Sequence, residues 1–130
     1  PSFPFTVLGV DFDTPDGTAI RDYVHVTDLA EAHCLALQYL DSGGASDAFN
    51  LGSGAGSSVL EVAAAAERAV GKPIARQIGP RRPGDPARLI ADSAKAKTAL
   101  GWRAKHPGLD DIIASALAWH ARDNPSNRKA

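Results

Sequence analysis

The chain has 130 residues, 44% hydrophobic and 22% charged, which is typical of a single globular domain and leaves no room for two. A formal net charge of −1 and scattered basic residues argue against an electrostatic role on nucleic acid or an anionic membrane. The apolar stretches fall far short of the ~20 residues that a membrane-spanning helix needs. Cys34 is the single cysteine, so no internal disulfide can form and a cytoplasmic setting is expected. Because the sequence starts at Pro1 and contains no Met, we expect a fragment of a longer protein.

Strand patterns alternate with helix patterns along the chain, which predicts an α/β fold. The first half is predicted to contain a strand over 5–9, a loop over 11–18, a strand over 19–26, a helix from 27 or 28 to 40, and a buried strand over 48–52. The second half is predicted to contain a helix from the capping box Ser58-x-x-Glu61 to Gly71, a strand over 73–79, a proline-rich loop over 80–86, a short helix capped by Asp92 and ended by Gly101, and a helix over 109–121. Residues 124–130 are polar and are expected to form a disordered tail.

Three aromatic residues are predicted to pack inside the fold. Tyr39 and Trp119 lie on helical faces and are expected in the core, and Trp102 is expected to pack the short helix down. The four histidines show no metal-ligand spacing. No paired-carboxylate, G-x-S-x-G or Cys/His arrangement indicates self-contained catalysis.

The glycine-rich segment 52–57 follows a predicted strand and precedes a helix, which is the context of a dinucleotide-binding turn. Its spacing is G-x-G-x-G rather than G-x-G-x-x-G, and the acidic residue expected after the next strand is replaced by Arg76-Gln-Ile-Gly79. We therefore interpret the segment as a tight structural turn in which glycine permits close packing.

Arginines occur beside acidic residues in two segments, Arg21-Asp22-Tyr23 and Arg81-Arg-Pro-Gly-Asp85. Arginine suits bidentate contact with phosphate, and a proline-rich loop loses little entropy when a ligand binds. One interpretation is a phosphorylated ligand held by arginines, with Asp85 on its sugar. The alternative is that Arg21 pairs with Asp22 or Asp28 and that the loop charges are only solvated.

Three motifs carry a resemblance to a known family. They are Asp13-Thr-Pro-Asp-Gly-Thr-Ala-Ile-Arg-Asp-Tyr-Val-His-Val-Thr-Asp-Leu-Ala30, Phe49-Asn-Leu-Gly-Ser-Gly-Ala-Gly-Ser-Ser-Val-Leu-Glu-Val62 and Pro80-Arg-Arg-Pro-Gly-Asp-Pro-Ala-Arg-Leu-Ile-Ala-Asp92. With them the chain resembles the sugar-nucleotide epimerases of the extended short-chain dehydrogenase/reductase family from about residue 5 to residue 119.

The resemblance implies a parent isomerase that holds NAD in an N-terminal Rossmann domain. Such an enzyme oxidises C4 of a hexose on a nucleotide sugar to a 4-keto intermediate and returns hydride to the other face. A Tyr-x-x-x-Lys pair moves the proton in this family. Tyr23 and Tyr39 are followed four residues later by Thr27 and Gly43, so this chain lacks the pair. We expect no bound cofactor, no catalytic residue and no epimerase activity in this chain alone.

The resemblance also implies that residues 1–123 form the C-terminal UDP-sugar-binding region. In the family pattern Thr6, Val7 and Leu8 offer backbone groups to the uracil, Arg21 and Arg82 hold the diphosphate, and Asp85 binds a ribose hydroxyl. Tyr23 and the loop residues Pro83 and Gly84 line the same pocket, and Leu89 limits the size of the sugar. The strand over 48–52 belongs to the Rossmann sheet of the N-terminal half, and the family's homodimer interface is expected to be absent.

Two other hypotheses remain open from the sequence. The parent is alternatively a related sugar-nucleotide dehydratase or 4,6-modifying enzyme. A different class is a stand-alone, non-catalytic nucleotide-binding module.

Overall fold

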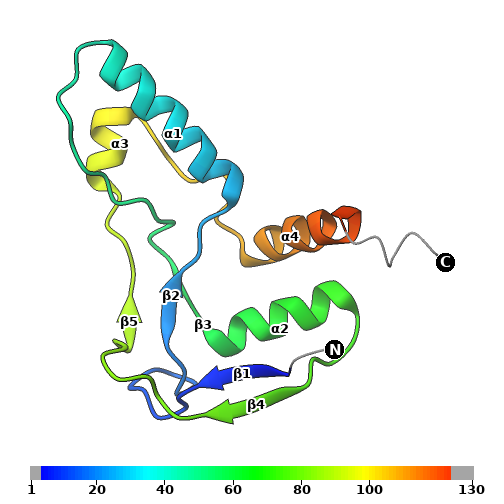
Figure 1. Ribbon diagram of the computed structural model, residues 1–130. Coiled ribbons are helices and arrows are strands. Elements are labelled where there is room, and N and C mark those ends of the chain that lie inside the picture. The colour runs from blue at the N-terminus through cyan, green and yellow to red at the C-terminus, as the bar shows by residue number, and fades with distance from the viewer. Residues whose placement is uncertain (1–3, 124–130) are drawn as a thin grey trace.

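The computed structural model describes residues 4–123, and the predicted tail over 124–130 lies outside them. Helices and strands alternate along the chain, as the sequence predicts (Figure 1). The elements are β1 (Phe5–Leu8), β2 (Ile20–Asp22), α1 (Val26–Asp41), β3 (Gly56–Ser58), α2 (Val59–Val70), β4 (Arg76–Gly79), β5 (Arg88–Leu89), α3 (Ala94–Leu100) and α4 (Leu109–Asp123). No helix among these is long and apolar enough to cross a bilayer.

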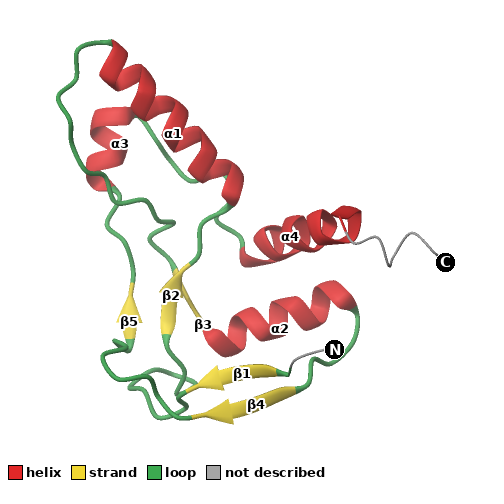
Figure 2. Ribbon diagram, in the orientation of Figure 1, coloured by secondary structure: helices red, strands yellow, loops and turns green. Residues whose placement is uncertain are grey.

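The strands form two small sheets (Figure 2). In the first, β1 and β4 are parallel, with Phe5 opposite Arg76 and Leu8 opposite Gly79. In the second, β2 is central, antiparallel to β3 and parallel to β5. Helix α2 packs against α4, whereas α1 and α3 pack together at the other end of the molecule. The proline-rich loop joins the two sheets, because it runs from the end of β4 to the start of β5.

Local signals set the ends of α2 as the sequence predicts. The Ser58 side chain accepts a hydrogen bond from the Glu61 amide, and the Glu61 carboxylate accepts one from the Ser58 amide, so the capping box forms in full. Gly71 ends the helix with φ of 68°, a left-handed conformation that glycine adopts without steric cost. For α3, the N-cap position is Ser93, while Asp92 accepts a hydrogen bond from the Ala94 amide.

The packing of α1 against α3 centres on Trp102. Its side chain is buried with Ala32 and Ala96, as expected for the residue that packs α3 down. The indole N–H donates to the carbonyl oxygen of Asp28 over 2.8 Å, so the buried ring has its polar atom satisfied. Asp28 is itself buried and accepts hydrogen bonds from the amides of Lys105 and His106. The start of α1 is therefore tied to the loop that follows α3.

The buried strand predicted over 48–52 does not form within residues 4–123, and its assignment to the Rossmann sheet of the N-terminal half stays a prediction. The segment is irregular, with Ala48 and Asn50 exposed. A strand requires a neighbouring strand to pair its backbone groups, and no described strand lies beside this segment. The strands predicted over 19–26 and 73–79 are also shorter than expected. Helix α1 begins at Val26, where the His25 side chain caps it, and β4 begins only at Arg76.

Two aromatic predictions have different outcomes. Trp119 is 64% exposed, so its assignment to the core is wrong within the described chain. Trp119 lines an open hollow between α4 and residues 24–27, so its ring borders empty space instead of packed side chains. Tyr39 is half-buried and packs edge-to-face on Phe49, with ring centroids 5.8 Å apart. Its neighbours on α1, Leu37 and Leu40, are exposed.

Candidate functional site

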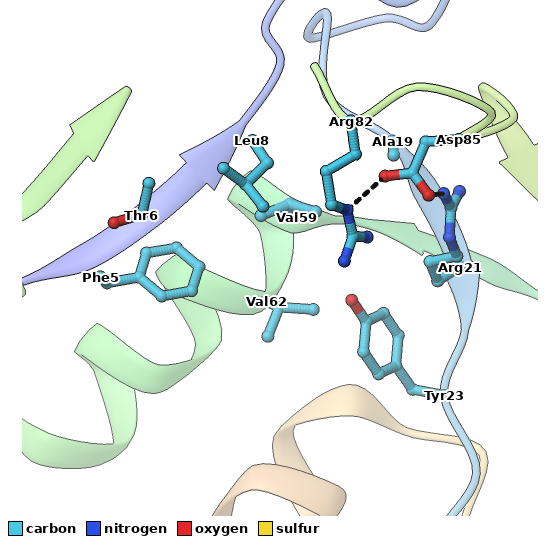
Figure 3. A pocket seen from close by; sticks show the side chains of 10 residues that line it. All are labelled: Phe5, Thr6, Leu8, Ala19, Arg21, Tyr23, Val59, Val62, Arg82 and Asp85. Atoms are coloured by element: carbon cyan, nitrogen blue, oxygen red, sulfur yellow. Dashed lines mark hydrogen bonds and ion pairs between the residues drawn. The ribbon is translucent and has the colours of Figure 1, made fainter. Parts of the chain in front are cut away.

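A hollow of about 260 Å³ opens where the two sheets meet the N-terminal half of α2 (Figure 3). Its walls combine apolar side chains with five polar residues that were predicted from the sequence. The lining residues are Phe5, Thr6, Leu8, Ala19, Arg21, Tyr23, Val59, Val62, Arg82 and Asp85. An apolar cleft with a few convergent polar groups is the usual form of a small-molecule site.

Arg21 lies in β2, and Tyr23 follows its last residue, Asp22; both line this hollow. The Asp22 carboxylate instead accepts hydrogen bonds from the glycine-rich turn and Ala91. Both side chains lie on the hollow's wall in Figure 3. Burial raises the pKa of the Tyr23 hydroxyl, although the charge of Arg21 acts in the opposite direction. Tyr23 is therefore a neutral phenol at physiological pH and can donate a hydrogen bond.

Asp85 lies between two guanidinium groups that come from segments far apart in the sequence. Arg82 Nε is 2.8 Å from Asp85 Oδ2, and Arg21 Nη2 is 3.5 Å from Asp85 Oδ1. Arg21 also donates through Nη1 to the carbonyl oxygens of Ile20 and Pro86, which fixes its direction. Two positive charges against one negative charge leave the group with a net positive charge. This arrangement suits an anionic ligand with several acceptor oxygens.

The structure separates the two neighbouring arginines of the proline-rich loop. Arg81 stacks over the Phe12 ring at 4.0 Å and pairs with Asp11, which anchors the loop. Arg82 points into the hollow, and its side chain is 64% exposed (Figure 3). The hypothesis that both are only solvated charges therefore fails for Arg81, which has a packing role, and leaves Arg82 available to a ligand.

The three residues of β1 named from the sequence divide into two kinds. The backbone amides of Phe5 and Gly9 donate hydrogen bonds to carbonyls beside or in β4. Every second residue of a strand directs its backbone groups to the same neighbour, so the backbone of Val7 also faces β4. Val7 is 1% exposed and does not line the hollow. Thr6 and Leu8 line it, and their backbone groups face the edge of β1 that no described strand occupies.

Three other predicted site residues lie away from the hollow's lining. Pro83 and Gly84 form the turn that lets the Asp85 amide donate to the Arg82 carbonyl, with Gly84 at φ of 82°. Leu89 is 61% exposed and lines a second hollow of about 370 Å³, together with residues 21–22, 50–51 and 90–92. Arg21 lines both hollows, so they meet at its side chain.

Sequence reasoning named Leu8 but missed the rest of the apolar lining. Phe5, Ala19, Val59 and Val62 surround the polar groups. Val59 and Val62 lie three residues apart on α2, and this helical spacing is the signal that places both on one face. The sequence does not show whether this face of α2 lines a hollow or packs in the core, because that depends on where β1 and β2 lie against the helix.

The glycine-rich turn does not fit a dinucleotide. Its amide donors are already used, because the Asp22 carboxylate accepts from the amides of Ser53 at 2.9 Å and Gly54 at 3.1 Å. The capping box occupies the start of α2, where a phosphate would otherwise bind. Gly52 is needed for packing, since a Cβ there would lie 2.3 Å from Asp22 Oδ2. Over residues 4–123, no group of three metal-binding side chains gathers.

Comparison with known proteins places this geometry in a family. Residues 4–52 match the model of the NAD dependent epimerase/dehydratase family. The chain is 52% identical over 116 residues to the UDP-glucose 4-epimerase of Lactobacillus helveticus, covering 89% of the chain and 35% of that protein. It is 53% identical over 114 residues to the Lacticaseibacillus casei enzyme, covering 88% of the chain and 34% of the enzyme. The chain thus spans about a third of the length of these curated relatives.

A solved structure gives the same result for the fold. The Bifidobacterium longum UDP-glucose 4-epimerase, in complex with NAD+ and UDP, superposes with a TM-score of 0.82 at 45% identity. The superposition covers 97% of this chain and 37% of that one. The chain therefore belongs to the NAD dependent epimerase/dehydratase family. Within the family, it corresponds in sequence and fold to the C-terminal part of the UDP-glucose 4-epimerases.

Proposed function

We propose that the chain is the UDP-sugar-binding part of a UDP-glucose 4-epimerase, an isomerase that interconverts UDP-glucose and UDP-galactose. The hollow beside Arg21, Tyr23, Arg82 and Asp85 holds the UDP group. The observation that carries the proposal is the pair of guanidinium groups from distant segments that converge on Asp85 beside a free strand edge. A diphosphate needs paired cationic donors, and a pyrimidine edge pairs well with open backbone groups.

The diphosphate oxygens take the place that Asp85 now holds on the two arginines, and Asp85 turns to a ribose hydroxyl. Arg82 has the freedom for this exchange because its side chain is 64% exposed, whereas Arg21 is fixed by two backbone carbonyls. Thr6 and Leu8 offer the uracil the backbone groups at the open edge of β1. Tyr23 donates its hydroxyl from the opposite wall of the hollow.

The hexose lies in the second hollow. Arg21 borders both spaces, so a sugar attached to a diphosphate at Arg21 extends toward Leu89. The Leu89 side chain is exposed in this space and limits the volume left for a substituent on the sugar. A preference for UDP-glucose and UDP-galactose follows from its intermediate size.

NAD, when bound in the complete enzyme, accepts and returns the hydride at C4 of the hexose. The described residues include no dinucleotide turn with free donors, because Asp22 occupies those of the glycine-rich segment. We assign NAD to the two thirds of the relatives' length that this chain does not match. We also propose a cytoplasmic setting with Cys34 reduced. That the chain does not form the family's homodimer stays a prediction.

The test is a calorimetric titration of the chain with UDP, with uridine as the matched ligand that lacks the diphosphate. We expect UDP to bind and uridine to bind far more weakly, because the arginines contact only the diphosphate. Equal affinities, or no binding of UDP, would remove the proposed function. A salt series adds a second criterion, since charge-assisted binding weakens as ionic strength rises.

A further inference from the structure

Asp22 faces away from the hollow assigned to UDP and ties two segments to β2, the glycine-rich turn and the segment after β5. Its Oδ1 accepts from the Ser53 amide at 2.9 Å and the Ser53 hydroxyl at 2.7 Å. Its Oδ2 accepts from the Gly54 amide at 3.1 Å and the Ala91 amide at 3.2 Å. We call this group, Asp22 with its four donors on Ser53, Gly54 and Ala91, the Asp22 clamp. Burial raises the pKa of this carboxyl, but the hydrogen bonds from these donors outweigh burial and lower it, so the clamp is charged at neutral pH.

The clamp lies where regular pairing of the central sheet ends. Strand β5 pairs with β2 through only two residue pairs, Ile20 with Arg88 and Arg21 with Leu89. Beyond these two pairs, the Asp22 carboxylate accepts a hydrogen bond from the Ala91 amide. A side chain therefore links the two segments where backbone pairing between β2 and β5 ends. On the other edge, β3 begins at Gly56, which lies opposite Asp22. The hydrogen bonds from Ser53 and Gly54 to Asp22 extend the contact between the two segments beyond this pair.

Arg21 depends on this arrangement for its direction. The arginine precedes Asp22 directly, and its guanidinium donates to the Pro86 carbonyl, which lies just before β5. Loss of the clamp frees the segment after β5 and allows β2 to rotate about its axis. Rotation of β2 moves Arg21, which lies in the strand, and also Tyr23, which follows the strand directly.

Gly52 supports the same conclusion from a separate observation. It is buried, and a Cβ at this position would lie 2.3 Å from Asp22 Oδ2 and 2.6 Å from the Ala91 side chain. Its φ is not in the left-handed region, so the requirement for glycine is one of space. The chain therefore keeps a side-chain-free position where the Asp22 carboxylate must sit.

We propose that Asp22, held against Gly52, is a positioning residue that sets the direction of Arg21 for the ligand's phosphate groups. The inference rests on the proposed function, since it assigns a role in the same site. Asp22 does not line the hollow assigned to UDP, although it borders the second hollow. UDP carries no hexose, so its affinity reports the effect of Asp22 that passes through Arg21.

The test measures UDP affinity by calorimetry at a temperature where circular dichroism shows each variant folded. Asp22→Asn places an amide N–H₂ against amide donors, and Gly52→Ala displaces the carboxylate. Each is expected to weaken UDP binding by about tenfold, the loss expected when a charged hydrogen bond is misdirected. Asp47→Asn is the matched control, because Asp47 pairs with Lys95 away from both hollows. It should leave the affinity unchanged.

A double-mutant cycle separates positioning from general loosening of the fold. In an Arg21→Ala background, Asp22→Asn should weaken UDP binding by less than about twofold, because its effect passes through a side chain already removed. An equal loss in both backgrounds, or wild-type affinity in the folded Asp22→Asn chain, would overturn the inference. If Arg21→Ala itself leaves UDP affinity unchanged, the proposed site fails and the inference fails with it.

Discussion

Trp102 and Asp28, 74 positions apart in the sequence, are joined by a hydrogen bond of 2.8 Å from the indole N–H to the backbone carbonyl. Replacing Trp102 by Phe keeps an aromatic ring but leaves the Asp28 carbonyl without the indole donor. The smaller ring also leaves a cavity between α1 and α3. We expect a loss of about 2–4 kcal/mol in the free energy of unfolding, from the cavity and the lost bond together. Urea denaturation followed by circular dichroism measures it. Trp119→Phe is the control, since Trp119 is exposed, and a loss as large there would contradict the account.

The second prediction concerns Arg82, the exposed arginine that lines the hollow. Arg82→Ala should weaken UDP binding by about 1.5–3 kcal/mol, because a charge-assisted contact with the diphosphate is lost. Arg82→Lys should recover only part of it, since an ammonium group cannot reproduce the fork of a guanidinium. Isothermal titration of the three chains gives the comparison. Arg76→Ala serves as the control, because Arg76 pairs with Glu67 and does not line the hollow. Unchanged affinity in both Arg82 variants would assign Arg82 to the solvated surface.

Sequence reasoning succeeds where the cause of a structure is local. The capping box and Gly71 define α2 from neighbouring residues alone, and both ends are as predicted. It fails at 48–52, because whether an extended apolar segment forms a strand depends on a partner outside that segment. The division between Arg81 and Arg82 was equally out of reach. Arg82 pairs with Asp85 three residues later, but the tertiary fold brings Phe12 to Arg81, and the sequence does not show that contact.

The third prediction follows from two carboxylates whose pKa values are lowered. For Asp22 and Asp16, burial raises the pKa, but hydrogen bonds from Ser53 and Gly54, and from Ser58 and Thr18, outweigh it. A carboxyl with a lower pKa in the folded state stabilises the fold above its unfolded pKa of roughly 4, and the stabilisation is lost as pH falls through the folded value. The free energy of unfolding should therefore decline below about pH 4.

Urea denaturation from pH 6 down to pH 3 measures this decline. Asp22→Asn should be less stable than wild type at pH 6 and should lose less stability on acidification, because one of the contributing carboxyls is gone. Identical slopes for the two chains would show that Asp22 does not contribute to the acid sensitivity. An Asp110→Asn chain, which loses the exposed ion pair with Arg68, tests whether any exposed ion pair gives the same result.

The fourth prediction concerns the size of the sugar. If the hexose occupies the second hollow, Leu89→Tyr should reduce binding of UDP-N-acetylglucosamine more than that of UDP-glucose, since overfilling a pocket costs about 1–3 kcal/mol. Leu89→Ser should shift the ratio of the two affinities in the opposite direction. Competition against a fluorescent UDP derivative gives the ratio for each variant. A ratio that stays constant in both variants would place Leu89 away from the sugar.

The most direct test of the central claim, that UDP binds between β1 and the Arg21–Arg82 pair, is an amide NMR titration of the chain with UDP. The account predicts concentrated shifts at the backbone amides of Thr6, Leu8, Arg21 and Asp85, with a common saturation curve. The amides of α3, which no part of the hollow touches, serve as the internal reference and should not move. Shifts centred on the glycine-rich turn at 52–57, or none at β1 and the proline-rich loop, would contradict the account.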